Sequence, residues 1–215
     1  MDYKVITFRG VEKCDIPYYI AKTLVSNNNK VLFIDNSISS DMFSSLEGYA
    51  QEPSLGISKG EIVFVKNSEP SPELCEKFDY IVYYIGMSKD ITTLGDNNYI
   101  ISDYRAHMID KIRENFNPIF FNVSFIMRDK ISEKIKENVL SELFGIDENK
   151  IAGYIFFDEK DYSNYINLTF NGIQGIEVSS DMREALRFIL MDITKESESE
   201  VAKNYINKGK RNKRI

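Results

Sequence analysis

The chain alternates between short apolar runs and segments whose apolar residues recur at helical spacing. The first apolar run, residues 5–8, leads into a turn at Gly10, and a helical pattern begins near Asp15. A second apolar run, residues 31–34, ends on Asp35. This order of strand, loop, helix and strand is typical of a βαβ unit with a right-handed parallel crossover.

The same alternation continues to the C-terminal part of the chain. It predicts five further strands, at residues 61–67, 79–86, 99–102, 118–125 and 151–157. Helical patterns lie at residues 41–46, 71–78, 104–115, 128–144, 161–170 and 181–193. Residues 80–85 are all apolar or aromatic, as in a strand covered on both faces. The pattern therefore predicts a three-layer α/β/α fold around a mostly parallel seven-stranded sheet.

Length and composition fit one globular domain and exclude several protein classes. The 215 residues are 43% hydrophobic, which is enough for a substantial core. No segment reaches the roughly 20 apolar residues that a membrane span needs, and the acidic start of the chain does not resemble a signal peptide. We therefore expect a cytoplasmic protein.

The net charge and the small number of Cys and His residues argue against several kinds of binding and catalytic site. A net charge of −6 argues against general nucleic-acid binding by the folded body. Cys14 and Cys75 lie far apart in the sequence and are expected to be reduced thiols. Because His107 is the single histidine, the chain offers little for a zinc site or a histidine-based catalytic triad.

The loop at residues 8–15 lies where α/β proteins bind phosphate, between the end of a first strand and the start of a helix. A phosphate loop of the form G-x-x-x-x-G-K-[ST] supplies a close backbone, a lysine and a hydroxyl for Mg²⁺. Here Lys13 is the lysine, Glu12 replaces the glycine before it, and Cys14 replaces the hydroxyl. Thr7 stands in place of the first glycine, so one of the four signature positions is kept.

Residues 10–13, the helix sequence DIPYYIAKTL and the strand VLFID resemble the start of the ParA/MinD family of deviant P-loop ATPases, whose loop reads KGGVGKTT. The resemblance implies a P-loop NTPase-like fold for residues 1–194. In this family a second lysine near the start of the loop serves the neighbouring subunit of an ATP-bound homodimer. Its place here is Phe8, and Arg9 beside it is the available substitute.

The resemblance also implies which residues would bind a nucleotide. They are Arg9, Gly10, Val11, Glu12, Lys13, Cys14, Asp15, Asp35 and Asn122. Asp35 matches an aspartate near Mg²⁺ and the attacking water, although an acid at a strand end is also ordinary turn chemistry. Asn122 stands in the place of an asparagine that recognises adenine, or is simply a polar residue at a strand end. The Walker B acid falls on Tyr83 or Tyr84, so this carboxylate is missing.

Efficient ATP hydrolysis is not expected from this set. A carboxylate at Glu12 would repel a β-phosphate about 4 Å away by roughly 4 kcal/mol at an effective dielectric constant near 20. Cys14 is a poor ligand for Mg²⁺, and the missing acid removes a further requirement of phosphoryl transfer. We expect no catalytic residues, no metal site and no bound cofactor, with ATP and Mg²⁺ as the alternative. Lys13 is predicted to form an internal ion pair, and its candidate partners are Glu12, Asp15 and Asp35.

Residues 195–215 differ in composition from the rest of the chain and are predicted to form a charged, flexible tail. The acidic ESESE is followed by the basic KGKRNKR. One interpretation is a solvated chain end, and the other is a basic arm that contacts an anionic membrane or nucleic acid. The tail lacks the apolar face of an amphipathic membrane helix.

Two classes of function follow from these observations. The first is a non-hydrolysing ParA/MinD-like protein, a pseudo-ATPase that binds protein partners and regulates or localises a larger assembly of the secretion, pilus or conjugation type. The second is a switch in which ATP drives dimerisation, for positioning or for DNA or plasmid partition. The sequence names neither the partner nor the cellular process.

Overall fold

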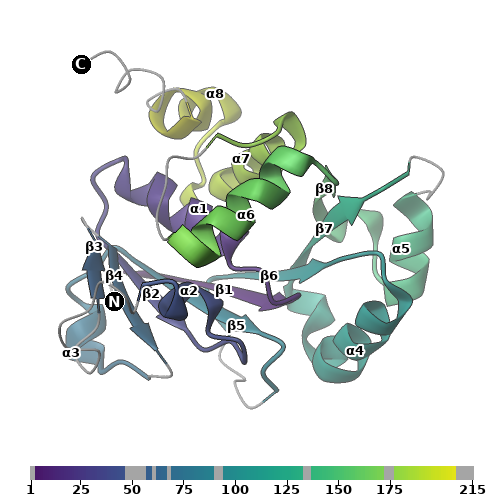
Figure 1. Ribbon diagram of the computed structural model, residues 1–215, viewed down its shortest axis with the longest axis horizontal. Helices are drawn as coiled ribbons and strands as arrows, with labels where there is room; N and C mark the ends of the chain where they lie inside the picture. The colour runs from purple at the N-terminus through teal and green to yellow at the C-terminus, as the bar shows by residue number, and fades with distance from the viewer. Residues whose placement is uncertain are drawn as a thin grey trace.

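A computed structural model of the chain describes residues 3–46, 57–59, 62–66, 69–89, 94–132, 137–171 and 177–206. Its centre is an eight-stranded sheet with helices on both faces (Figure 1). The strand order is β3-β4-β2-β5-β1-β6-β7-β8. The predicted three-layer α/β/α architecture is therefore confirmed.

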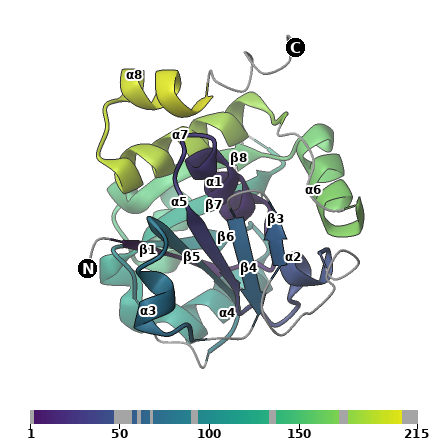
Figure 2. The ribbon, with the colours of Figure 1, turned by 90° about the vertical axis from the view of Figure 1, so that its left-hand side faces the viewer.

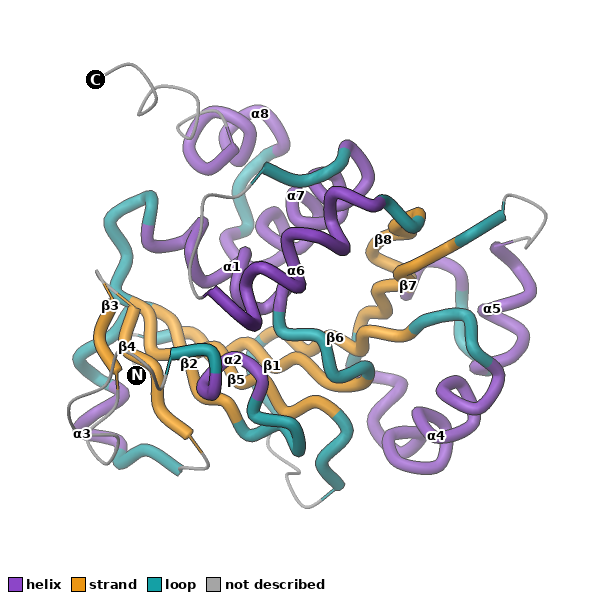
Figure 3. The backbone as a smooth tube through the Cα atoms, viewed as in Figure 1, coloured by secondary structure: helices purple, strands orange, loops and turns teal. Residues whose placement is uncertain are grey.

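Seven of the strands run parallel to one another and form a continuous layer (Figure 3). They are β1 (Lys4–Gly10), β2 (Val31–Asp35), β4 (Ile62–Lys66), β5 (Tyr80–Gly86), β6 (Asn97–Ser102), β7 (Ser124–Lys130) and β8 (Ile151–Phe156). The eighth strand, β3 (Ile57–Lys59), pairs antiparallel with β4 at the edge of the sheet. The sequence did not predict β3, because three residues are too few to show a period.

The helices form the two outer layers (Figure 2). One layer holds α1 (Asp15–Val25), α6 (Glu159–Asn171), α7 (Ser180–Thr194) and α8 (Glu198–Val201). The other holds α3 (Pro72–Cys75), α4 (Ala106–Phe116) and α5 (Glu137–Phe144). The short α2 (Asp41–Ser44) follows β2 and contacts α6.

The alternation of side chains along the strands divides the core between these layers. Ile6 and Phe8 of β1 belong to the apolar cluster that includes α1 and α7. In β2, Leu32 and Ile34 belong to the opposite cluster, which includes Cys75 of α3. Since successive side chains of a strand point to opposite faces, both faces of the sheet are apolar and covered.

The segment before β7 differs from the prediction. A strand was predicted at residues 118–125, but Asn117–Asn122 form a 3-10 helix and β7 begins at Ser124. Pro118 lies in the first turn of this helix, where its fixed φ and its missing N–H are tolerated. The helix predicted from residue 128 is wrong in its first part, since Arg128 lies in β7 and α5 begins at Glu137.

The predicted boundary between the domain and its tail lies too early in the chain. Val201 of α8 is fully buried in the cluster that contains α1 and α7. Arg187 of α7 also pairs with Glu198, at 2.6 Å between Nη1 and Oε1. The folded body therefore extends past residue 194 at least to the end of α8. The basic sequence at residues 208–214 lies outside the described residues.

Among the described helices, none combines the length and the apolar character that crossing a bilayer requires.

Candidate functional site

The β1–α1 loop, residues 11–14, turns sharply and lies against β6. Gly10 has a φ of +101°, and a Cβ at this position would clash with the carbonyl oxygen of Ile101. The backbone N–H of Val11 donates to that oxygen at 2.9 Å, and the N–H of Lys13 donates to the carbonyl of Val11 at 2.8 Å. Glycine is therefore required at the turn. Two backbone N–H groups that a phosphate loop would offer to its ligand are engaged by carbonyl groups of the chain.

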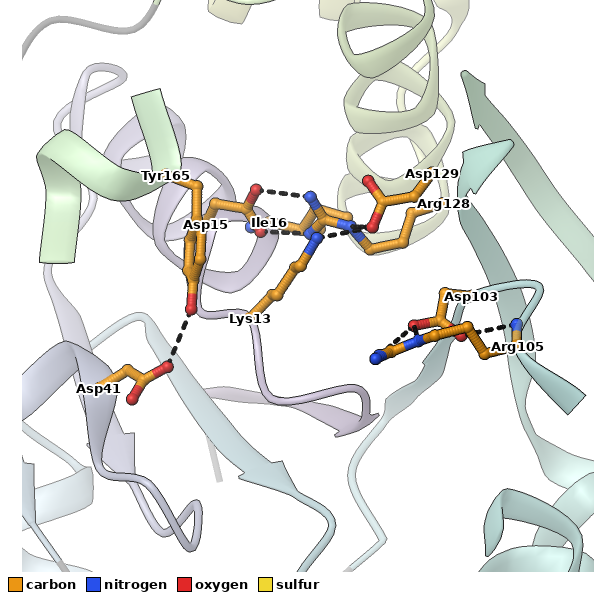
Figure 4. A network of polar contacts seen from close by, with 9 residues as sticks. All are labelled: Lys13, Asp15, Ile16, Asp41, Asp103, Arg105, Arg128, Asp129 and Tyr165. Carbon is orange, nitrogen blue, oxygen red and sulfur yellow. Dashed lines mark hydrogen bonds and ion pairs between the residues drawn. The ribbon is translucent and has the colours of Figure 1, made fainter. Parts of the chain in front are cut away.

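The ammonium of Lys13 contacts the carboxylate of Asp129, with 2.6 Å between Nζ and Oδ2 (Figure 4). The rings of Tyr162 and Tyr165 from α6 flank this ammonium, with their centroids 5.9 and 5.7 Å from Nζ. The hydroxyl of Tyr165 donates to Asp41 of α2 at 3.1 Å, so α6 is fixed over the loop. The structure thus contains an ion pair at Lys13. Its partner lies at the end of β7, a position that the sequence did not suggest.

The three predicted partners of Lys13 make other contacts. The prediction that Glu12, Asp15 or Asp35 pairs with Lys13 was wrong. Each of these carboxylates accepts hydrogen bonds from other groups of the chain. Burial raises the pKa of Asp129, but the charges of Arg128 and Lys13 outweigh burial and hold this pKa below its usual value. Asp129 is therefore an anion at neutral pH and a suitable partner for Lys13.

Asp15 occupies the N-terminus of α1. Its Oδ1 accepts from the N–H of Ile16 at 2.9 Å, within the first turn of the helix. Both carboxylate oxygens also accept from the guanidinium of Arg128, at 2.6 and 3.0 Å (Figure 4). A helix N-terminus favours a negative charge. Here that charge belongs to the chain itself and is neutralised by a buried arginine.

The carboxylate of Glu12 joins three loops at the carboxyl edge of the sheet. It accepts from the N–H of Met87, after β5, at 2.7 Å. It also accepts from Ser39, after β2, at 2.6 Å from Oγ and 3.2 Å from the backbone N–H. The anionic group that the sequence places near a β-phosphate is thus held by backbone and hydroxyl donors.

Asp35 organises the turn that follows β2. Its Oδ1 accepts from the N–H and the hydroxyl of Ser37, and its Oδ2 accepts from the N–H of Phe43 in α2 at 2.9 Å. Burial raises the pKa of Asp35, and the hydrogen bonds from Ser37 and Phe43 oppose that rise. These contacts fit the second interpretation of Asp35 from the sequence, an acid that caps a turn.

Tyr84 takes the place that the resemblance assigns to the Walker B acid. Its side chain is 1% exposed and lies in the same apolar cluster as Cys14, whereas Tyr83 lies against the cluster of α3 on the other face. Within the described part of the chain the Tyr84 hydroxyl has no hydrogen-bond partner. Burial raises the pKa of the Cys14 thiol, so it is not a thiolate ligand. In the described ranges, no three His, Cys, Asp or Glu residues are grouped as a metal site.

Two predicted site residues lie away from the loop. Arg9 is 2% exposed, its Nη1 donates to Thr7 at 2.8 Å, and burial lowers its pKa to about 10. Its side chain thus lies inside the subunit, and Phe8 beside it stacks on Tyr99 in the core. Asn122 ends the 3-10 helix before β7, at the amino edge of the sheet. The β1–α1 loop lies at the opposite edge, so the structure does not bring Asn122 to this loop.

The residues of the loop do not fit a bound ATP with Mg²⁺. The N–H groups of Val11 and Lys13 bind carbonyl oxygens, the Lys13 ammonium binds Asp129, and the buried thiol of Cys14 is not a hard oxygen ligand. Sequence reasoning missed Arg128 and Asp129 because it placed them in a helix. The signal that could have found them is the largely apolar run from Val123 to Met127, which continues past the predicted end of the strand at residue 125.

The fold is similar to solved structures of MinD. A MinC:MinD cell division protein complex from Aquifex aeolicus matches with a TM-score of 0.62 and 16% identity, over 90% of this chain and 97% of that one. The MinD cell division protein of Aquifex aeolicus matches with a TM-score of 0.61 and 16% identity, over 90% and 98% of the two chains. No protein-family model matches the chain, and no curated protein sequence does. The chain therefore has a ParA/MinD-like fold of the P-loop NTPase type.

Proposed function

We propose that this ParA/MinD-like protein works by binding protein partners, as a non-hydrolysing regulator or localiser of a larger assembly. The observation that carries the proposal is the ion pair between Lys13 and Asp129, at 2.6 Å. In a working phosphate loop this lysine binds β- and γ-phosphate oxygens. Here its charge is already balanced within the chain.

Nucleotide binding at this loop would require several native contacts to break. A phosphate at Lys13 would displace Asp129, leave it with Arg128 as its cation, and add a second anion beside it. The N-terminus of α1 is also neutralised by Arg128 and Asp15. Each change removes a favourable contact or adds repulsion between like charges. These energetic costs support the proposal that the protein binds protein partners through its surface and does not depend on a nucleotide.

Two observations support a protein partner. One of the similar structures is a MinC:MinD cell division protein complex, so a protein of this fold assembles with another protein. In this chain, large apolar side chains are exposed at the carboxyl edge of the sheet, among them Ile38 at 73% and Ile131 at 79%. These two side chains are our candidates for contact with a partner, because contiguous exposed apolar patches mark surfaces that bind other proteins. The assembly type, secretion, pilus or conjugation, follows from the family resemblance alone.

The proposal is tested by calorimetric titration of the full chain with ATP and Mg²⁺. The expected result is no heat of binding at millimolar ATP, which bounds the binding free energy at about −4 kcal/mol or weaker. Sedimentation with and without ATP should show the same oligomeric state. Lys13→Ala is the matched control, and it should behave as the wild type does.

Micromolar ATP binding that Lys13→Ala abolishes would overturn the proposal. That result would favour the alternative function, a switch in which ATP drives dimerisation. Salt-sensitive retention on DNA that is lost when residues 208–215 are deleted would instead favour DNA partition.

A further inference from the structure

Three loops at the carboxyl edge of the sheet meet at one carboxylate. Glu12 is in the loop after β1, and its Oε1 accepts from the N–H of Met87 after β5 at 2.7 Å. Its Oε2 accepts from the hydroxyl and the N–H of Ser39 after β2, at 2.6 and 3.2 Å. The side chain thus receives three hydrogen bonds from two loops that are distant in the sequence.

Gly86 lets the carboxylate of Glu12 come close to the backbone after β5. Gly86 has a φ of +56°, a region that glycine adopts without strain. A Cβ at Gly86 would clash with the Oε1 of Glu12, so this glycine leaves room for the carboxylate. Backbone N–H groups that converge at the ends of parallel strands are typical donors to anions.

We propose that Glu12 is an anion supplied by the chain itself, which holds the loops after β2 and β5 against the loop after β1 in place of an anionic ligand. Hydrogen bonds to an ionised acceptor are about twice as strong as neutral ones. Because the carboxylate is covalently attached, the arrangement of the loops does not depend on the concentration of any ligand. The proposal rests on the proposed function, since a nucleotide-driven switch would need its ligand to set these loops.

One consequence concerns the surface that meets a partner. Ile38 lies between Ser37, which donates to Asp35, and Ser39, which donates to Glu12. Its side chain is 73% exposed although both neighbours are held. The Glu12 contact thus fixes the residue next to an exposed apolar side chain.

Amide hydrogen exchange of the full chain, followed by NMR without nucleotide, tests the proposal. In Glu12→Ala, exchange at the N–H groups of Ser39 and Met87 should rise about tenfold, the effect of losing a hydrogen bond to a charged acceptor. The N–H groups of Ser37 and Phe43 donate to Asp35 and should keep their wild-type rates, which shows that the variant is folded. Added formate should restore the slow exchange of Ser39 and Met87.

Two results would overturn the proposal. Wild-type exchange at Ser39 and Met87 in Glu12→Ala would overturn the proposal, because other contacts would then hold the loops. Restoration by chloride at the same ionic strength as formate would also overturn it, because screening rather than a bound carboxylate would be responsible. Glu114→Ala, which removes an exposed carboxylate from α4, should change neither rate. ATP binding by the wild type would overturn the proposed function but is measured separately from these rates.

Discussion

Arg128 at the end of β7 donates to both carboxylate oxygens of Asp15 at the start of α1, at 2.6 and 3.0 Å. Both side chains are almost fully buried. The pair joins the strand layer to the helix layer and cancels the charge at the helix N-terminus (Figure 4). A segment that would attract an anion in other α/β proteins is therefore nearly neutral here.

Arg128→Met should lower the free energy of unfolding by about 3–5 kcal/mol, because it leaves the carboxylate of Asp15 buried without a partner. Urea unfolding measures the loss. The matched control is Lys160→Met, which breaks an ion pair with Glu177 in which the two side chains are 48% and 70% exposed. The control should cost less than about 1 kcal/mol. Equal losses in the two variants would contradict the role of the buried pair.

Tyr84→Phe should leave the free energy of unfolding unchanged or raise it by up to about 1 kcal/mol, because the variant removes a buried hydroxyl that has no partner among the described residues. Tyr99→Phe is the matched control. Its hydroxyl donates to Asp192 at 2.6 Å, and its removal should cost about 1–3 kcal/mol. Thermal or urea unfolding compares the two. A clear loss in Tyr84→Phe would show that its hydroxyl is hydrogen-bonded in solution.

The stabilisation from Asp129 should depend on pH. Arg128 and Lys13 outweigh burial and hold the pKa of Asp129 below its usual value. A carboxyl group whose folded pKa lies below its unfolded pKa stabilises the fold above the unfolded pKa, and this contribution is lost as the pH falls through the folded pKa. The difference in unfolding free energy between the wild type and Asp129→Asn should be largest at neutral pH and shrink below about pH 4.

Urea unfolding at a series of pH values from neutral to about pH 3 measures this difference. Asp35→Asn provides a contrast, because burial raises the pKa of Asp35. A raised folded pKa stabilises the fold below the unfolded pKa, and that contribution is lost as the pH rises through the folded pKa. The two variants should therefore differ from the wild type with opposite pH trends. A difference for Asp129→Asn that grows in acid would refute the assigned direction.

Asp35→Ala should destabilise α2 by about 1–2 kcal/mol, because the N–H of Phe43 loses its carboxylate acceptor. The expected sign is faster amide exchange at Phe43 and at Ser37. Ser44→Ala is the comparison, because Ser44 lies in the same helix and is exposed. That variant should change stability by less than about 0.5 kcal/mol. A larger effect of Ser44→Ala than of Asp35→Ala would contradict the capping role.

Most of the fold could be predicted from short stretches of sequence. The seven parallel strands produce apolar runs, and only the sixth of them was misplaced, by a few residues around Pro118. The loop at residues 11–14 follows from the order of the first strand and helix. The turn at Asp35 follows from the hydrogen-bonding habit of Asp and Ser at strand ends. The burial of Val201 could not be predicted from the local sequence, because α8 is four residues long and mostly polar.

The sequence by itself determined the elements and the place of the loop, because hydrophobic periodicity depends on residues a few positions apart. Only the tertiary structure decided which charges meet. Lys13 and Asp129 are separated by 116 positions, and they meet because β6 alone lies between β1 and β7 in the sheet. Glu12 and Met87 meet because β5 lies beside β1 on the other side. Polar contacts at this edge of the sheet depend on the order of the strands, which no local pattern specifies.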